Sequence, residues 1–168
     1  RALITDTMKT YGRLDILVNN AGMNIRKPPE QYTLAEWHTV MDSNLTSAFV
    51  CSHAAFPEMK KGGAGKIINI GSMMSIFGAS FTTAYAASKG GIVQMTRAMA
   101  CAWAKDNIQV NAVLPGWINT ELTKGARRDV PGRSEVFGFF MNTVPVRCRV
   151  EDAQAIAGRR RRVLILQE

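Results

Sequence analysis

The sequence predicts one α/β domain built on a parallel sheet, on three observations. Short apolar runs at residues 14–18, 66–72 and 108–114 are typical of buried parallel strands. Two longer segments between these runs, 33–59 and 85–105, are expected to be helices. A length of 168 residues and an apolar content of 46% are ordinary for a single globular domain.

The first elements are the end of a helix and a strand. Residues 7–11 are expected to end a helix that Gly12 closes, and residues 14–18 follow as the first strand. Asn19–Gly22 ends this strand, where small residues let the backbone approach a ligand closely. Residues 23–32 are expected to form a loop beside the site.

The helix over 33–59 has a clear start. Thr33 and Glu36 have the spacing of a capping box, in which a hydroxyl and a carboxylate satisfy free amides. Asn44 lies in the middle of this helix, where asparagine is a mediocre helix former. Without further marks, the plain alternative for Asn44 is a polar residue on the exposed face.

The second half begins at a glycine-rich turn, which leads into the strand 66–72. The loop 73–83 is partly apolar, which suits either a pocket wall or a buried core segment. In the helix 85–105, Gly90 and Gly91 cost about 1 kcal/mol each relative to alanine, so close approach of another helix or of a cofactor is expected there. Pro115-Gly116 turns out of the strand 108–114.

Composition excludes few function classes. The net charge of +8 is diffuse apart from the run Arg159–Arg162, so a basic nucleic-acid-binding module is the weaker hypothesis and a solvated tail is expected. No apolar stretch reaches the ~20 residues that span a bilayer, and no signal peptide is recognisable, so no membrane partner is expected. The scattered Cys51, Cys101 and Cys148 suggest free thiols, no metal site and a cytoplasmic location.

A candidate site is formed by Ser72, Tyr85 and Lys89. Tyr85 and Lys89 are four residues apart on a helix and share one face. Tyrosine ionises near pH ~10, and a neighbouring cation is expected to lower that pKa toward neutrality. Ser72 ends a strand, and ligands of open α/β sheets bind at the carboxyl ends of strands. The three residues predict a site that polarises a carbonyl group and gives it a proton.

These residues belong to a longer series that resembles the short-chain dehydrogenase/reductase family. The series is Asn19-Asn20-Ala21-Gly22, Asn44, Ser72, Tyr85, Lys89, Pro115-Gly116, Ile118 and Thr120. The resemblance covers roughly residues 8–125. It implies a partial Rossmann-like, doubly wound parallel sheet that retains the family's strands 4, 5 and 6 with flanking helices.

The resemblance also implies an activity and a set of site residues. The implied reaction is hydride transfer between NAD or NADP and a small-molecule carbonyl or secondary alcohol. The implied catalytic residues are Asn44, Ser72, Tyr85 and Lys89, with the backbone carbonyl of Asn44 holding a water that connects Lys89 to solvent. The implied cofactor-binding residues are Asn19, Ala21, Gly22, Tyr85, Lys89, Pro115, Gly116, Ile118 and Thr120.

The resemblance also bears on the substrate class and on the oligomeric state. Several segments are most similar to gluconate 5-dehydrogenases and 2-deoxy-gluconate 3-dehydrogenases, which implies a sugar acid or polyol; the alternative is a 3-oxoacyl carrier-protein reductase. Arg26 and Lys27 either attract a substrate carboxylate or are two solvated loop cations. The resemblance implies a homodimer or homotetramer formed through helices 33–59 and 85–105.

The chain also departs from the family pattern. Family members begin with a strand and a turn Thr-Gly-x-x-x-Gly-x-Gly that holds the pyrophosphate, and this sequence lacks that turn, so the choice between NAD and NADP is not readable. Residues 1–125 are expected to be the C-terminal part of an NAD(P)-binding domain. Residues 126–168 are expected to be a substrate-covering segment and a divergent tail, which a reading-frame slip would explain. Two unpaired sheet edges and weak dinucleotide binding are therefore expected, and an inactive fragment is the alternative interpretation.

Overall fold

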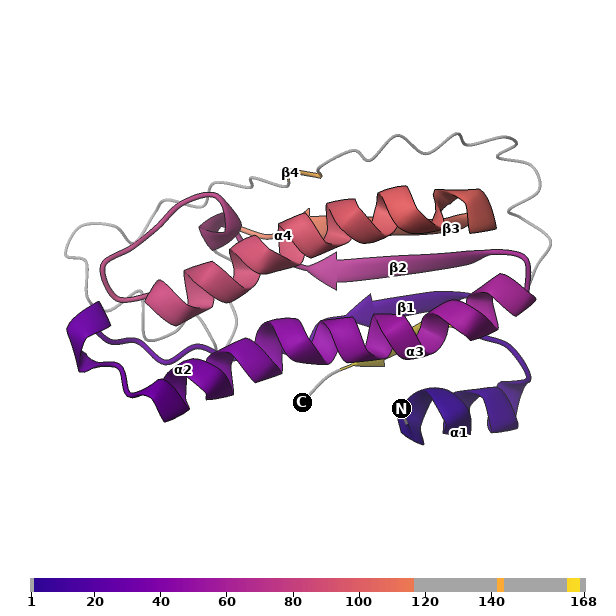
Figure 1. Cartoon of the computed structure of the whole chain (residues 1–168), viewed down its shortest axis with the longest axis horizontal. Coiled ribbons are helices and arrows are strands. Elements are labelled where there is room, and N and C mark those ends of the chain that lie inside the picture. The colour runs from indigo at the N-terminus through magenta and orange to yellow at the C-terminus, as the bar shows by residue number, and fades with distance from the viewer. Residues whose placement is uncertain (1, 117–141, 144–162, 167–168) are drawn as a thin grey trace.

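A computed structural model of the chain describes residues 2–116, 142–143 and 163–166. Helices and strands alternate through most of this part (Figure 1). The helices are α1 (Ala2–Tyr11), α2 (Leu34–Met41), α3 (Ser47–Lys61) and α4 (Thr83–Trp103), with shorter turns η1 (Pro29–Gln31), η2 (Asp42–Thr46), η3 (Met73–Ser75) and η4 (Ala104–Asp106). The strands are β1 (Ile16–Asn19), β2 (Gly65–Ile70), β3 (Ile108–Leu114), β4 (Asn142–Thr143) and β5 (Val163–Leu166).

The three predicted strands form the centre of one sheet, with strand order β4-β3-β2-β1-β5. β1 pairs with β2, and β2 with β3, in parallel. The predicted fold class is therefore confirmed. The third strand has its predicted bounds, whereas β1 begins and ends later than expected and β2 ends at Ile70, two residues before Ser72.

The edges of this central sheet differ from the prediction. β5 pairs in parallel with β1, from Ile16 opposite Val163 to Asn19 opposite Leu166. β4 pairs with the end of β3 in antiparallel orientation. The expectation that both edges stay unpaired is wrong, because the apolar run Val163–Leu166 supplies backbone groups that complete the ladder of β1.

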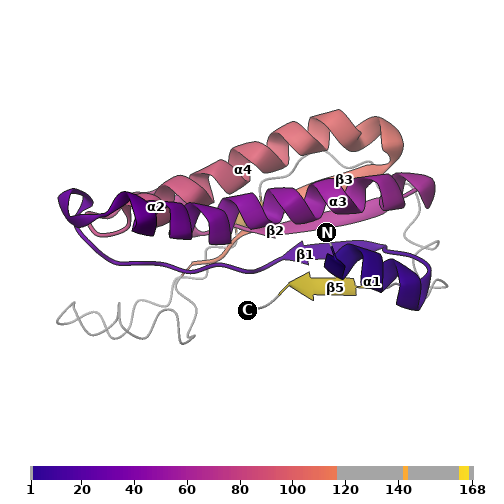
Figure 2. The same cartoon turned by 60° about the horizontal axis from the view of Figure 1, so that its bottom comes forward.

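The described helices lie over one face of the sheet. α3 and α4 run side by side across it in both views, and α1 lies near β1 and β5 (Figures 1 and 2). A buried apolar cluster joins α1, α3 and α4 to the strands and contains Ile4, Leu14, Leu17, Ala55, Met59, Ile67, Met99, Ala100, Ile108 and Val110. Within the described residues, no helix is both long enough and apolar enough to cross a membrane.

The predicted helix 33–59 is interrupted in its middle. The capping box at its start is confirmed, because Thr33 Oγ1 accepts from the amide of Glu36 while the Glu36 carboxylate accepts from the amide of Thr33. The segment η2 is π-helical and contains Asn44. Such π-bulges are rare and frequently lie at functional sites.

Close packing explains one of the two glycines in α4, Gly91, but not Gly90. A Cβ atom on Gly91 would lie 2.7 Å from Leu45 Cδ2, so Gly91 allows η2 to approach α4 closely, as predicted for another helix. A Cβ atom on Gly90 would be in ordinary contact, 3.7 Å from the carbonyl oxygen of Ser75. The loop before α4 exposes Ile76, Phe77 and Phe81, so the interpretation of this loop as a buried core segment is wrong.

Gly65 provides a test of the packing between β2 and α3. A Cβ atom at this position would lie 2.7 Å from Met59 Cβ and 2.4 Å from Met59 Sδ. Overpacking of this kind costs about 1–3 kcal/mol, so we expect Gly65→Ala to lower the free energy of unfolding by that amount in urea denaturation. Gly78→Ala is the matched control, because no atom lies within 4 Å of the added Cβ. Equal midpoints for the two variants would contradict this packing.

Candidate active site

The structure brings Ser72, Tyr85 and Lys89 together at the carboxyl end of the parallel strands. Ser72 follows β2 and caps η3, while Tyr85 and Lys89 lie in the first two turns of α4. Ser72 and Lys89 are buried, with exposed fractions of 9% and 4%, and Tyr85 is half-buried. Lys89 Nζ lies 5.8 Å from the centroid of the Tyr85 ring. The predicted clustering of these three side chains is therefore observed.

The hydroxyl of Ser72 has a defined orientation. Ser72 Oγ accepts a hydrogen bond from the amide of Met74 at 3.1 Å, within a capping box that Ser75 completes. Hydrogen bonding to the side chain of Ser72 also acts to lower the pKa of Tyr85. Met74 occupies one lone pair of Ser72 Oγ, and the hydroxyl keeps its proton and a second lone pair for other partners.

Burial raises the pKa of Tyr85 above its ordinary value, while the hydrogen bond with Ser72 and the positive charge of Arg26 act in the opposite direction. The prediction that this pKa falls toward neutrality is wrong for this arrangement. Desolvation dominates for a half-buried phenol, and the neighbouring charge that counteracts it comes from the loop residue Arg26. In this state Tyr85 is a protonated phenol at neutral pH.

Lys89 is fixed by the end of β2. Lys89 Nζ donates to the carbonyl oxygen of Ile70 at 2.7 Å. Burial lowers the pKa of Lys89 from 10.5 to about 8, because desolvation penalises the charged form. An ammonium group has three N–H donors, and Ile70 is its one hydrogen-bond acceptor among the described residues. No other acceptor for this ammonium lies among residues 2–116, 142–143 and 163–166.

Asn44 is a buried structural link, not an exposed polar residue. Its exposed fraction is 1%, which rules out the alternative of a polar residue on the exposed face. Asn44 Oδ1 accepts from the amide of Met23, and Asn44 Nδ2 donates to the carbonyl of Met23 and to Ser88 Oγ. Ser88 Oγ in turn donates to the carbonyl of Tyr85 at 2.8 Å. The amide of Asn44 thus joins the loop after β1 to the first turn of α4.

Asn19 has its side chain inside the layer between sheet and helices. Asn19 Nδ2 donates to Asn69 Oδ1 at 2.7 Å and to Ser52 Oγ at 2.9 Å, and Asn69 Nδ2 donates to Thr96 Oγ1. These contacts connect β1, β2, α3 and α4. The side chain of Asn19, a predicted cofactor-binding residue, is therefore engaged in the interior, which leaves its backbone for such a contact.

The residues near Lys89 fit the hydroxyl groups of a ribose of a dinucleotide. A Cβ atom on Gly22 would lie 3.2 Å from both Asn44 Oδ1 and Lys89 Nζ, so the absence of a side chain keeps the approach to Lys89 open. Ala21 is half-buried beside Gly22, and Pro115 and Gly116 follow β3, where the Pro115 carbonyl accepts from the amide of Met73. Ile118 and Thr120 lie outside the described residues. Free ammonium protons beside a phenol suit a diol such as a ribose.

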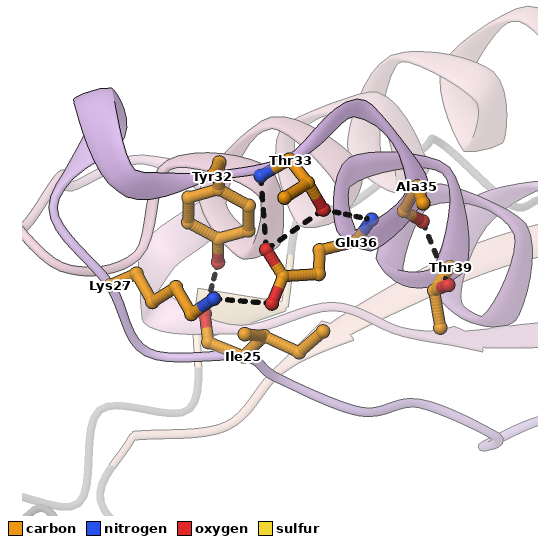
Figure 3. A network of polar contacts seen from close by, with 7 residues as sticks. All are labelled: Ile25, Lys27, Tyr32, Thr33, Ala35, Glu36 and Thr39. Atoms are coloured by element: carbon orange, nitrogen blue, oxygen red, sulfur yellow. Dashed lines mark hydrogen bonds and ion pairs between the residues drawn. The ribbon is translucent and has the colours of Figure 1, made fainter.

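The loop 23–33 is held by several polar contacts. Lys27 forms an ion pair with Glu36 at the start of α2, and the hydroxyl of Tyr32 donates to the carbonyl of Ile25 (Figure 3). The amide of Lys27 also donates to the carbonyl of Phe81, in the loop before α4. Lys27 is therefore paired with Glu36. The positive charge of Arg26, by contrast, acts to lower the pKa of Tyr85.

Sequence reasoning missed two serines of this site. Ser88 connects Asn44 to Tyr85, and Ser75 contacts the backbones of both Ser72 and Lys89. A serine inside a helix is a weak signal, since it is often solvated. The usable signal was spacing, because Ser88 and Ser75 each lie three residues after a predicted catalytic residue.

Comparisons with known proteins agree with this arrangement. Residues 1–131 match the family described as short chain dehydrogenase. A 2-dehydro-3-deoxy-D-gluconate 5-dehydrogenase of Escherichia coli is 41% identical over 136 residues, covering 80% of this chain and 54% of the relative. A 5-keto-D-gluconate 5-reductase of the same species is 42% identical over 128 residues, covering 76% of this chain and 50% of the relative.

A solved structure gives the same result. The chain is similar to a gluconate 5-dehydrogenase from Burkholderia cenocepacia, determined in complex with NADP and tartrate, with a TM-score of 0.74 and 37% identity. This match covers 77% of the present chain and 51% of the other. The chain thus spans about half the length of the curated relatives it matches. With its family match, its parallel sheet and its clustered Ser72, Tyr85 and Lys89, the chain belongs to the short-chain dehydrogenase family.

Proposed function

We propose that the full gene product is an NAD(P)-dependent oxidoreductase that interconverts a carbonyl and a secondary alcohol. The observation that carries this proposal is the cluster of Ser72, Tyr85 and the buried Lys89 at the carboxyl ends of parallel strands. The family membership supports the same reaction class. The dinucleotide, when bound, supplies or accepts the hydride at the substrate carbon.

The residues of this chain supply the proton and the charge stabilisation. In reduction, the hydroxyl of Ser72 donates to the substrate oxygen, and Tyr85 Oη gives that oxygen a proton. In oxidation, Tyr85 takes the proton from the alcohol. The ammonium of Lys89 stabilises the phenolate that Tyr85 becomes after donating its proton, and it holds hydroxyl groups of the bound dinucleotide. The pKa of Tyr85 lies above its ordinary value in this state, which favours the acid role.

The proposed substrate class is a sugar acid, with a polyol as the broader class. Relatives named for gluconate-type acids and a similar structure that contains tartrate support an anionic polyhydroxy substrate. Arg26 supports this class independently. Its positive charge acts on Tyr85, and it would also attract the carboxylate of a short substrate bound beside Tyr85.

Replacing Arg26 tests this substrate class. A hydrogen bond to a charged group contributes about 1.5–3 kcal/mol, which corresponds to roughly 10- to 10²-fold in KM. We expect Arg26→Met in the full gene product to raise KM for a keto sugar acid by that factor and to leave KM for a neutral keto sugar nearly unchanged. The matched control is Lys27→Met, because Lys27 is paired with Glu36. A similar rise for acid and neutral substrates, or for both variants, would contradict the assignment of Arg26.

We also propose that two copies of the protein associate through α2–α3 and α4. Phe49 and Val50 on α3 remain 48% and 39% exposed, and such apolar exposure is typical of an interface. We expect light scattering of the full gene product to give a dimer or tetramer, and Phe49→Glu to shift it toward monomer. A monomer at high protein concentration would contradict this interface.

A further inference from the structure

One hydroxyl group connects the two elements that carry the candidate catalytic residues. Ser75 Oγ accepts a hydrogen bond from the amide of Ser72 at 3.1 Å. The same oxygen donates to the carbonyl of Lys89 at 2.7 Å. Ser72 follows β2 and Lys89 belongs to α4, so this contact ties the end of a strand to a helix across the site.

The position of Ser75 is closely packed. A Cβ atom on Gly71 would lie 3.1 Å from Ser75 Oγ and 3.3 Å from the carbonyl oxygen of Val113. A Cβ atom on Gly90 would lie 3.7 Å from the carbonyl oxygen of Ser75. Glycine at 71 thus leaves the space in which the hydroxyl lies, and Gly90 faces the carbonyl of Ser75.

The contact also controls the direction of the Ser72 side chain. Ser72 and Ser75 form a capping box, in which Ser75 Oγ accepts from the amide of Ser72 and Ser72 Oγ accepts from the amide of Met74. Ser72 has an extended backbone, with φ −163° and ψ 162°. Without the hydroxyl of Ser75, the amide of Ser72 loses its acceptor, and the amide of Met74 alone then holds Ser72 within the capping box, so the side chain of Ser72 is held less firmly.

We propose that Ser75 is a positioning residue of the reaction, whose hydroxyl fixes Ser72 relative to Lys89 so that both act on the same bound molecule. This inference rests on the proposed function, and Ser75 itself touches neither substrate nor dinucleotide. Misplacement of a reacting group by about 1 Å costs up to about 10²-fold in rate, so a partial loosening of Ser72 corresponds to a loss of roughly 10-fold.

The first test is a double-mutant cycle in the full gene product. We expect Ser75→Ala to lower kcat about 10-fold with little change in the KM of the dinucleotide, and Ser75→Thr, which keeps the hydroxyl, to restore most of it. If Ser75 acts through Ser72, then Ser75→Ala has little further effect in a Ser72→Ala background. Ser80→Ala, an exposed serine of the same loop, is the matched control. An equal fold loss in both backgrounds would overturn the positioning role.

A second readout does not depend on turnover. We expect amide hydrogen exchange at Ser72 to accelerate in Ser75→Ala and to stay slow in Ser75→Thr, because the exchanging amide loses its acceptor in the alanine variant alone. The pH at which oxidation begins is expected to rise in Ser75→Ala, since a looser Ser72 no longer lowers the pKa of Tyr85. Absence of turnover in the unaltered protein would overturn the proposed function and this role with it. Unchanged exchange at Ser72 in Ser75→Ala would overturn the role of Ser75 alone.

Discussion

Replacing Tyr85 with phenylalanine is expected to lower kcat by about 10²-fold or more, the usual contribution of a positioned general acid or base. The phenylalanine ring keeps the half-buried packing of Tyr85 at the start of α4 but cannot hold a proton. Steady-state kinetics in both directions measure the effect. The loss is expected in kcat and in kcat/KM alike, because the proton transfer occurs in the transition state.

Folding and chemistry can be separated in this experiment. Tyr11→Phe removes a hydroxyl from an exposed tyrosine on α1 and is the matched control. Its kcat is expected to equal that of the unaltered protein, and both variants are expected to have nearly the same melting temperature. A Tyr85→Phe variant that turns over at the unaltered rate would exclude Tyr85 as the proton donor.

Replacing Lys89 with methionine is expected to produce the second large effect, again about 10²-fold in kcat/KM if the ammonium acts with Tyr85 as proposed. Burial holds the pKa of Lys89 near 8, so the unaltered protein should lose kcat/KM as the pH rises through about 8 and the ammonium loses its proton. The kcat/KM profile reports groups of the free enzyme, so it is the profile to measure.

The same pKa predicts how stability depends on pH. Between about pH 8 and 10.5 the unfolded chain holds a proton on Lys89 that the folded chain has released. The free energy of unfolding therefore gains a contribution that rises with pH through this window, and Lys89→Met removes it. Lys105→Met is the control, because Lys105 is exposed beyond the end of α4. A Lys89→Met variant that keeps the high-pH loss of kcat/KM would assign that loss to another group.

Much of the fold and the site follows from local sequence signals. The strand β3 has its predicted bounds because its apolar run is bounded by Asn107 and Pro115, residues that end regular structure. Thr33 and Glu36 set the start of α2 through a contact that spans three residues. The clustering of Tyr85 and Lys89 was predictable because helix geometry alone places them on one face.

The features that were missed depend on tertiary contacts. The contacts of Asn44 were not predictable because helix propensity says nothing about a loop that returns to it, and here Met23 and Ser88 surround its amide. The direction of the pKa shift of Tyr85 was missed because desolvation depends on packing around the ring. The pairing of β5 with β1 joins residues far apart in sequence, and no pattern near residue 163 specifies its partner.

The most direct test of the central claim is a deuterium-transfer experiment on the full gene product. The protein is mixed with a keto sugar acid and with NADPH or NADH that carries deuterium at the transferable position of nicotinamide C4, and the product is examined by mass spectrometry. The proposal predicts one deuterium on the new carbinol carbon, formed by the unaltered protein and at least about 10²-fold more slowly by Tyr85→Phe. A product without deuterium, or the same labelling rate in Tyr85→Phe, would contradict it.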